Sequence, residues 1–243
     1  MDNQRIRLNK FLAERLGCSR READEMIQSG KIAIDGKTAE LGARIDKSNK
    51  VCYNKRIVPF QTEYLYLAFH KPVGYVCSRH QQGDAPTIYS ILPQQYQNLK
   101  TVGRLDKDSS GLILLTNDGD FSFRMTHPKF RKTKVYEVEL DHSLEPLHQQ
   151  MISDYGVALE DGISKFKVIA SPVDAANEAK ATGVAGNQPS RTRFTVILTE
   201  GRNRQIRRTF AALGYRVTKL HRTSFGKYEL GGLPVGKYDI IKP

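Results

Sequence analysis

The stretch Gly103-Arg104-Leu105-Asp106-Lys107-Asp108-Ser109-Ser110-Gly111-Leu112-Ile113-Leu114-Leu115-Thr116 is the part of this 243-residue chain from which its fold and function are best inferred. Its first half is polar and rich in turn-forming residues, whereas residues 112–115 form a continuous apolar run. A short apolar run between turn residues is typical of a strand buried on both faces. The sequence therefore predicts that Asp106 lies on a loop anchored by a core strand, where scaffolds usually hold reactive groups.

A calcium site and an ordinary turn are two alternative interpretations of this acidic loop. The loop begins like an EF-hand calcium site, with acidic or polar residues at its first, third and fifth positions counted from Asp106. Its ninth and twelfth positions, however, are Leu114 and Asn117, so the bidentate Glu that completes the calcium sphere is missing. An ordinary turn, in which the aspartates only hydrogen-bond nearby backbone, leaves the other motifs of the chain unexplained.

Four ordered blocks of the sequence resemble the pseudouridine synthase family. The catalytic motif of that family is Gly-Arg-Leu-Asp, a short polar run, Gly, Leu and an apolar strand, and residues 103–115 match every element. The other blocks are Lys71-Pro72-Val73-Gly74, Lys134-Val135-Tyr136 and Glu200-Gly201-Arg202-Asn203-Arg204-Gln205-Ile206-Arg207-Arg208. The segment before them resembles the RNA-binding module of a small-subunit ribosomal protein that several RNA enzymes share. This combination is similar to the RsuA-like branch of bacterial ribosomal RNA pseudouridine synthases.

The resemblance implies an isomerase that flips one uridine out of folded ribosomal RNA and converts it to pseudouridine with an aspartate nucleophile. It assigns the nucleophile to Asp106, its cationic partner to Arg207, and stacking on the base or proton movement to Tyr136. Arg104 corresponds to the residue that fills the gap or holds the phosphate, and Leu220 to an apolar wall of the pocket. Further substrate contacts are expected from Lys71, Arg202, Arg204 and Arg222.

The chemical route stays open at this point. A carboxylate can attack the anomeric carbon of the sugar, attack the uracil ring, or act as the base in an elimination that gives a glycal. No cofactor is expected, because the isomerisation is redox-neutral and the chain has no Gly-rich phosphate loop or metal-binding motif. The six histidines include no pair at ligand spacing on one helix, so no metal site is predicted.

The charge of the chain predicts a polyanionic partner. Lys and Arg number 38 against 26 acidic residues, a formal net charge of +12. Residues 200–227 alone contain eight basic residues and one acidic residue, a local net charge of +7. We expect ribosomal RNA or an assembling ribosomal subunit as the partner. Residues 202–208 look closer to the large-subunit members of the family, which favours large-subunit ribosomal RNA over the small-subunit alternative.

The cysteines and the apolar runs bear on the compartment. Cys18, Cys52 and Cys77 are odd in number and widely spaced, which supports neither a disulfide framework nor a structural zinc site. The N-terminus has no apolar signal core, and no apolar run approaches the ~20 residues of a membrane helix. The sequence predicts a cytoplasmic, monomeric protein with no membrane segment.

Residues 1–58 are expected to form a small RNA-binding module of two helices and a hairpin. Apolar residues recur at helical spacing from Leu8 to Leu16, Ser19 begins a capping box, and Asp35-Gly36 predicts a hairpin turn. The residues expected to contact RNA are Arg7, Lys10, Arg20, Arg21 and Lys31. The alternative for these side chains is a solvated charged face.

The rest of the chain is expected to form a larger α+β domain. Residues 54–62 lose clear periodicity, so residues 59–63 are assigned as a linker and residues 64–243 as the catalytic domain. Besides the core strand after Asp106, strands are expected over 64–69, 75–78, 135–140, 166–169, 193–199 and 215–220, and helices after Ser143 and over 202–214. Residues 174–190 are predicted to be an insertion loop. This order indicates a mixed, mostly antiparallel sheet.

Two functions from other classes share part of this pattern. A non-catalytic RNA-binding assembly factor would have the same basic surface, but it does not need an aspartate between Arg104 and the core strand. A metal-dependent nuclease would use carboxylates as metal ligands. Its candidate ligands are Asp106, Asp108, Asp118 and Asp120.

Overall fold

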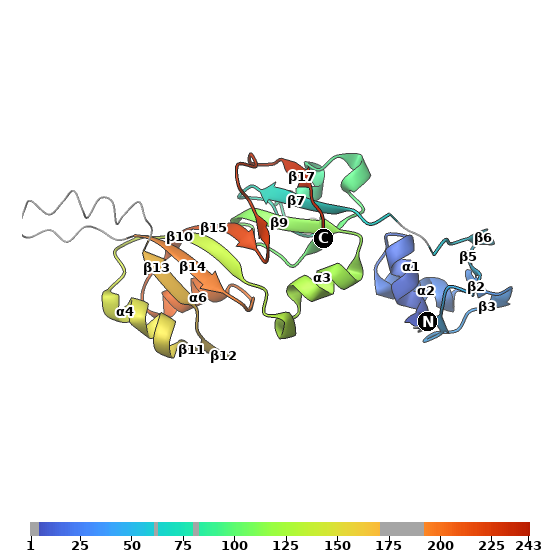
Figure 1. Cartoon of the computed structure of the whole chain (residues 1–243), viewed down its shortest axis with the longest axis horizontal. Coiled ribbons are helices and arrows are strands. Elements are labelled where there is room, and N and C mark those ends of the chain that lie inside the picture. The colour runs from blue at the N-terminus through green and yellow to red at the C-terminus, as the bar shows by residue number, and fades with distance from the viewer. Residues whose placement is uncertain (1–4, 61–62, 80–82, 171–191) are drawn as a thin grey trace, which may run out of the picture. The chain divides into compact units, whose positions relative to one another are not determined.

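The computed structural model describes residues 5–60, 63–79, 83–170 and 192–243, which form two compact units (Figure 1). The N-terminal unit comprises the chain through Leu65 together with Asn98–Lys100 and Thr116–Gly119. The larger unit comprises Tyr66–Gln97, Thr101–Leu115 and Asp120–Pro243. The predicted insertion loop at 174–190 lies outside the described residues.

Two helices and short antiparallel strands build the N-terminal unit. Helix α1 spans Leu8–Arg15 and α2 spans Arg20–Gln28, and both pack on a core that includes Phe11, Ile27 and Val51. The predicted capping box is confirmed, because Ser19 Oγ accepts a hydrogen bond from the Glu22 amide and the Glu22 carboxylate accepts one from the Ser19 amide. The strands are β1 (Ile6–Arg7), β2 (Ile32–Ile34), β3 (Lys37–Thr38), β4 (Arg44–Ile45), β5 (Val51–Tyr53) and β6 (Arg56–Ile57).

Residues 54–57 correct the predicted loss of regular structure. Strands β5 and β6 pair antiparallel across Asn54-Lys55, whose φ angles of 46° and 64° fit a two-residue hairpin turn. The turn lacks the glycine that usually identifies such hairpins, and β6 has only two residues, so the sequence pattern was too short to indicate it. The hairpin of β2 and β3 at Asp35-Gly36 forms as predicted.

A mixed sheet forms the centre of the larger unit, with strand order β13-β14-β10-β15-β9-β7-β17. Strands β9 and β15 run parallel, whereas β13–β14, β14–β10, β10–β15 and β7–β17 are antiparallel. The predicted mixed, mostly antiparallel sheet is therefore confirmed. The strands are β7 (Tyr66–Lys71), β9 (Ser110–Thr116), β10 (Lys134–Leu140), β13 (Lys167–Ala170), β14 (Arg193–Leu198), β15 (Val217–Phe225) and β17 (Tyr238–Ile240), with β8 (Lys100–Val102) beside β9 and β16 (Tyr228–Glu229) beside β15.

The helices of the larger unit are few and short. Figure 1 shows α4 and α6 near β13 and β14, and α3 on the side of β9. Helix α3 buries Phe121 and Met125 against β9 and β15 residues such as Leu112 and Phe225. These helices are α3 (Gly119–Thr126), α4 (Pro146–Gln150) with the π-helical turn Met151–Tyr155, and α6 (Gln205–Ala212); the remaining elements are the 3₁₀ turns Ile88–Ser90, Gln94–Tyr96 and Pro128–Phe130 and the hairpin of β11 (Val157–Leu159) and β12 (Gly162–Ser164).

Three expectations about the larger unit were wrong in detail. Residues 75–78 form no strand and make a single bridge between Val76 and Thr87. Ser143 does not cap α4, which begins after Glu145 because Pro146 fits the first helical position. Strand β15 continues to Phe225, so Arg222 lies inside it rather than after it. Its polar residues masked the strand in the sequence.

Gly111 explains how the loop of Asp106 is brought beside β15. Ser110 and Gly111 pair with His221 and Arg222, and a Cβ at Gly111 would collide with the backbone of Arg222. The φ angle of Gly111 is 106°, which also favours glycine. The following apolar run, Leu112–Leu115, is fully buried, as predicted. The parallel pairing therefore fixes the loop against the middle of the sheet.

Candidate active site

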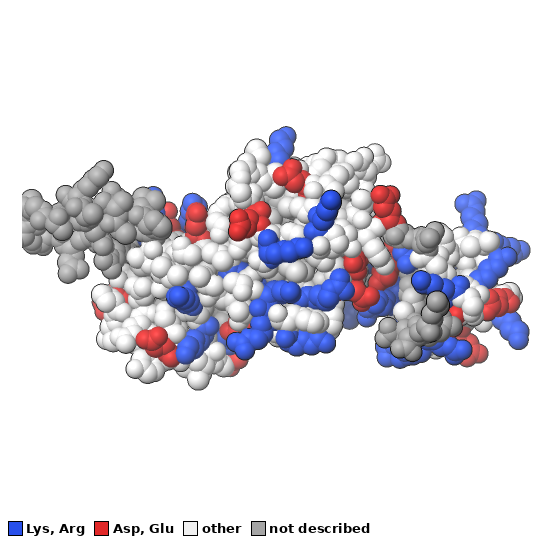
Figure 2. Space-filling view, in the orientation of Figure 1, with Lys and Arg blue, Asp and Glu red and all other residues white. Residues whose placement is uncertain are grey.

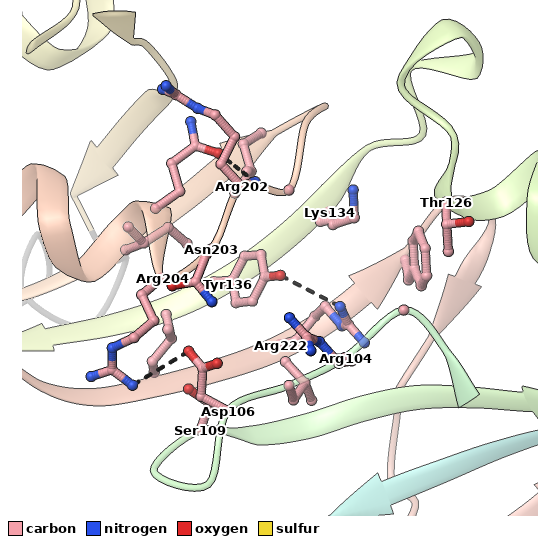
Figure 3. A pocket seen from close by; sticks show the side chains of 18 residues that line it. Arg104, Asp106, Ser109, Thr126, Lys134, Tyr136, Arg202, Asn203, Arg204 and Arg222 are labelled. Carbon is pink, nitrogen blue, oxygen red and sulfur yellow. Dashed lines mark hydrogen bonds and ion pairs between the residues drawn. The ribbon is translucent and has the colours of Figure 1, made fainter. Parts of the chain in front are cut away.

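Asp106 lies at a cavity of about 250 Å³ in the larger unit (Figure 3). The cavity is lined mainly by the loop before β9, the start of β10, the second half of β15 and the turn that leads into α6, with single residues from the ends of α3 and β14. Among the site residues expected from the sequence, the cavity lining includes Arg104, Asp106, Tyr136, Arg202, Arg204, Leu220 and Arg222. It does not include Lys71 or Arg207. The fold thus brings together most of the predicted residues from distant positions.

Lys71 supports the loop of Asp106 instead of lining the cavity. Its side chain is fully buried, and its ammonium donates hydrogen bonds to the Ser109 carbonyl at 2.6 Å and the Pro72 carbonyl at 2.9 Å. Burial lowers the pKa of Lys71 to about 8. The Gly74 amide donates to the Lys107 carbonyl at 2.7 Å, so the block 71–74 holds both sides of the loop.

The cation next to Asp106 is Arg204, whereas the sequence pairing named Arg207. Arg204 Nη1 lies 3.6 Å from the Asp106 carboxylate, and the Arg204 guanidinium also donates two hydrogen bonds of 3.2 Å to Asp108. The backbone of Arg204 has a left-handed φ of 46°, which is uncommon for a residue with a side chain. The turn before α6 thereby directs this guanidinium toward the loop (Figure 3).

Arg207 fixes the far end of the same loop. Its guanidinium donates to the Asp108 carbonyl at 2.9 Å and to the Val217 carbonyl at 2.8 Å, and Nε lies 3.3 Å from the Asp108 carboxylate. Burial raises the pKa of Asp108, but Arg204 and Arg207 outweigh it, and the pKa falls below its usual value. Arg207 therefore connects α6, β15 and the loop, and Asp108 is the carboxylate it binds.

Arg202 and Arg208 point to a different acid. Arg202 donates to the carbonyls of Asp161, Gly162 and Ile163 and to the Asp161 carboxylate, and Arg208 makes two hydrogen bonds to that same carboxylate. Figure 3 shows the Arg202 side chain directed away from Asp106. These two arginines fasten the β11–β12 hairpin to the start of α6.

Tyr136, Leu220 and Arg222 form a mostly buried wall of the cavity. Arg222 is 2% exposed, and its Nε donates to the Leu112 carbonyl at 2.7 Å while Nη1 lies 3.5 Å from the Tyr136 hydroxyl. The guanidinium lies over the Phe225 ring, 4.9 Å from its centroid. Its Nη2 is buried and has no hydrogen-bond partner within the described residues. An unpaired buried donor in the cavity wall is available to an acceptor atom of a ligand.

Lys134 lines the cavity although no role for it was expected from the sequence. Its ammonium donates to the Glu200 carbonyl at 3.2 Å and lies 5.2 Å from the Phe225 ring centroid. Burial, with Arg222 nearby, lowers the pKa of Lys134 to about 8 against the opposing effect of Glu200. The signal that could have identified it is its place in the Lys-x-Tyr block. Lys134 adds a fifth basic residue to a lining whose one acidic residue is Asp106.

The cations expected to bind RNA in the N-terminal unit differ in exposure. Arg7, Arg20, Arg21 and Lys31 are exposed, and Lys10 is half-buried. Helix α2 begins with Arg20 and Arg21 directly after the capping residue Ser19. The four exposed side chains therefore face solvent and are accessible to a polyanion.

Within the part of the chain that the structure describes, no three His, Cys, Asp or Glu side chains come together to hold a metal ion. Asp106 and Asp108 face arginines, as described above. No helix among the described residues is long and apolar enough to cross a membrane.

Comparison with known proteins matches both units. Residues 65–212 match the RNA pseudouridylate synthase family and residues 6–51 match the S4 domain. The ribosomal small subunit pseudouridine synthase A of Pasteurella multocida is 34% identical over 96% of this chain and 94% of its own length. The chain belongs to the RNA pseudouridylate synthase family. The expected family and isomerase activity are thereby confirmed.

Other pseudouridine synthases match at nearly the same level. The ribosomal large subunit pseudouridine synthase B of Bacillus subtilis is 32% identical over 98% of this chain and 92% of its own length. The ribosomal large subunit pseudouridine synthase B of Yersinia pestis is 33% identical over 95% of this chain and 70% of its own length. A crystal structure of a pseudouridylate synthase superimposes with a TM-score of 0.64, 28% identity and coverage of 98% of this chain and 96% of that one. The pseudouridylate synthase assignment thus holds for the whole chain.

Proposed function

We propose that this pseudouridylate synthase isomerises a uridine of ribosomal RNA, with Asp106 as the nucleophile. The observation that carries the proposal is the position of Asp106, the single carboxylate at a small cavity whose other lining side chains are basic, neutral polar, aromatic or apolar. A cavity of about 250 Å³ suits one nucleotide base rather than a length of RNA. The target uridine would therefore be flipped out of the RNA to enter it.

The reaction moves one bond and one proton. The bond between N1 of uracil and C1′ of ribose breaks, a bond between C5 and C1′ forms, and the hydrogen on C5 is lost while N1 gains one. Asp106 can attack C1′, attack the uracil ring, or remove a sugar proton to give a glycal. Each route needs an ionised carboxylate, and Arg204 Nη1 lies 3.6 Å from that of Asp106.

The cavity wall provides partners for the base and its phosphate. Tyr136 and Leu220 offer apolar surface for the uracil ring, and the unpaired Nη2 of Arg222 can donate to a uracil carbonyl. Arg104 is exposed at the cavity rim, where its guanidinium suits the phosphate of the flipped nucleotide. Arg207 acts indirectly, by holding the loop of Asp106 through Asp108.

The N-terminal unit is proposed to bind RNA outside the cavity. Its match to the S4 domain and its exposed cations Arg7, Arg20, Arg21 and Lys31 support this role. A second RNA contact on the same chain raises apparent affinity without changing the chemistry. The enzyme is proposed to act as a monomer in the cytoplasm, without a cofactor.

We also propose that the target uridine lies in the RNA of the large ribosomal subunit. Relatives named for the small and the large subunit match at 34% and 32–33% identity, so similarity does not separate them. The run at residues 202–208 favours large-subunit RNA. Mapping pseudouridines in both ribosomal RNAs, with and without the gene, tests this choice: loss of a small-subunit pseudouridine would overturn it.

Incubation of the purified protein with unmodified ribosomal RNA and a metal chelator tests the activity itself. The expected result is one new pseudouridine at a defined position, detected by chemical mapping, at a rate unaffected by the chelator. RNA cleavage that the chelator abolishes would identify a nuclease. Tight RNA binding with no modified base would identify an assembly factor instead.

A further inference from the structure

The segment between α3 and β10 carries aromatic rings on the outside of the protein. Phe123 is 45% exposed and Phe130 is 37% exposed, and the ring of the exposed His127 lies between them in sequence. Ring centroids are 4.7 Å apart for Phe123 and His127, and 5.8 Å apart for Phe123 and Phe130. Three exposed rings in mutual contact form a continuous aromatic surface, which we call the aromatic shelf.

The turn that carries the shelf is ordered by its own hydrogen bonds and follows a residue anchored in the core. The Phe130 amide donates to the His127 carbonyl at 3.1 Å, and the Lys129 amide donates to His127 Nδ1 at 3.2 Å. Directly before the shelf turn, Met125 is buried in the core of the sheet. The exposed rings therefore do not result from a loosely attached segment, and the protein keeps them in place although apolar surface is thereby exposed to water.

The surroundings of the shelf are cationic. No acidic residue occurs between Asp120 and Glu137, whereas this interval contains Arg124, Lys129, Arg131, Lys132 and Lys134. Figure 2 shows Lys and Arg side chains gathered in the region where Figure 1 places α3 and the turn after it. Aromatic rings within a cation-rich segment match the pattern of single-stranded nucleic acid sites, in which bases stack on rings and cations pair with phosphates.

The shelf borders the cavity of Asp106. Thr126, immediately before His127, lines the cavity, as does Lys134 at the start of β10. A Cβ on Gly103, the residue before Arg104, would contact the Thr126 methyl group at 3.6 Å. A strand of RNA with one base in the cavity would consequently have its neighbouring nucleotides within reach of the shelf.

We propose that the aromatic shelf of Phe123, His127 and Phe130 stacks unpaired bases that flank the target uridine. The proposal rests on the proposed function in taking RNA as the molecule bound at the cavity. It adds that the flanking RNA is single-stranded there, because a base in a duplex has no free face to offer. Lys129 now lies over both phenylalanine rings, at 5.3 and 4.8 Å from their centroids. This exposed lysine is displaced by the base and pairs with its phosphate.

Tryptophan substitution provides a direct test, because the natural chain contains no tryptophan. Phe123→Trp and Phe130→Trp are prepared in the Asp106→Asn background, so that bound RNA is not converted. A short uridine-containing single strand is expected to quench the fluorescence of both, with the same midpoint as its binding measured by anisotropy. The control is Tyr155→Trp, at a site 73% exposed on the turn after α4, where no quenching is expected.

A binding measurement accompanies the fluorescence. Phe123→Ala combined with Phe130→Ala is expected to weaken single-strand affinity by about tenfold or more while leaving the salt dependence unchanged. Lys129→Gln is expected to reduce the salt dependence instead. Duplex RNA of the same sequence is expected to bind without quenching the tryptophans. If the double alanine variant fails to fold, the tryptophan variants decide the question alone.

The proposal that the shelf stacks unpaired bases would be overturned if the single strand did not quench the tryptophans, or if the duplex or the Tyr155→Trp control gave equal quenching. It would also be overturned if the double alanine variant bound RNA with unchanged affinity. Self-association of the protein that the double alanine variant abolishes would instead identify the shelf as a contact between copies of this chain. Pseudouridine formation by the wild-type enzyme is measured separately. If the shelf does not stack bases, pseudouridine formation by the wild type is still observed. If the protein does not form pseudouridine, the binding and quenching experiments still report whether RNA stacks on the shelf.

Discussion

Two basic regions of this protein, the turn before α6 and the N-terminal unit, use arginine in opposite ways. In this turn and at the start of α6, the cations Arg202, Arg204, Arg207 and Arg208 bind Asp106, Asp108 and Asp161 and several backbone carbonyls. In the N-terminal unit, Arg7, Arg20 and Arg21 are exposed. Both regions are equally conspicuous in the sequence as clusters of positive charge.

The difference shows why local net charge does not locate an RNA contact. An arginine paired with a carboxylate has little net charge to offer a phosphate, and it stabilises one position of a loop. An exposed arginine contributes to attraction at long range and to salt-dependent binding. We therefore expect changes in the α6 turn to alter turnover, and changes in the N-terminal unit to alter affinity.

Asp106→Asn should have the largest effect on turnover. It removes the nucleophile but keeps the shape of the loop, so we expect single-turnover pseudouridine formation to fall by about a thousandfold or more. RNA affinity should stay within a few-fold of the wild type. Asp108→Asn is the matched control and should be much less damaging. A larger loss in the control would show that the wrong carboxylate has been chosen.

Arg207→Lys should have the next largest effect. Lysine keeps the charge but cannot bridge Asp108 and the Val217 carbonyl with a planar fork. A loop displaced by a fraction of an ångström can cost on the order of a hundredfold in rate. Turnover should fall while affinity holds, as measured by single-turnover kinetics and filter binding. Arg208→Lys is the control, because Arg208 binds Asp161 and not the loop of Asp106. An equal loss of turnover in this control would contradict the specific role of Arg207 in holding the loop.

Arg20→Gln combined with Arg21→Gln should change binding alone. Loss of two phosphate contacts would reduce the slope of log affinity against log salt by roughly 1.5, with turnover at saturating RNA unchanged. Arg202→Gln is the control, because its charge is already paired with Asp161 and Glu200. An identical slope change in both variants would contradict the comparison between the two regions.

The smallest expected effect is on stability at low pH. The pKa of Asp108 is lowered in the folded protein, so its ion pairs stabilise the fold above the unfolded pKa, and this stability is lost as pH falls through the folded pKa. Near neutral pH, the melting temperature of the wild type should be higher than that of Asp108→Asn. This difference in melting temperature should disappear only below the usual titration range of Asp. Calorimetry across that range measures it. A difference in melting temperature that does not change with pH would show that the ion pairs of Asp108 do not stabilise the fold.

Local patterns in the sequence predicted much of the fold. The capping box at Ser19, the hairpin at Asp35-Gly36 and the buried strand after Gly111 each depend on neighbouring residues, so the structure reproduces them. The strand around Arg222 and the hairpin at Asn54-Lys55 were missed because prediction from sequence depends on such local patterns. Their stability comes from pairing with distant strands, which leaves only a weak local signal.

The sequence by itself determined the family, the aspartate on its loop and the residues gathered near it, because a motif keeps the order of its side chains whatever their distances. Only the tertiary structure decided which arginine faces which acid. Arg204 and Arg207 are three positions apart, and whether one of them reaches Asp106 or Asp108 depends on the left-handed turn at Arg204 and on the register of β9 against β15. Likewise, only tertiary packing could separate Lys71, buried beneath the loop, from Lys134 at the cavity. Burial and direction of a side chain arise from contacts between segments far apart in the chain, and composition does not encode them.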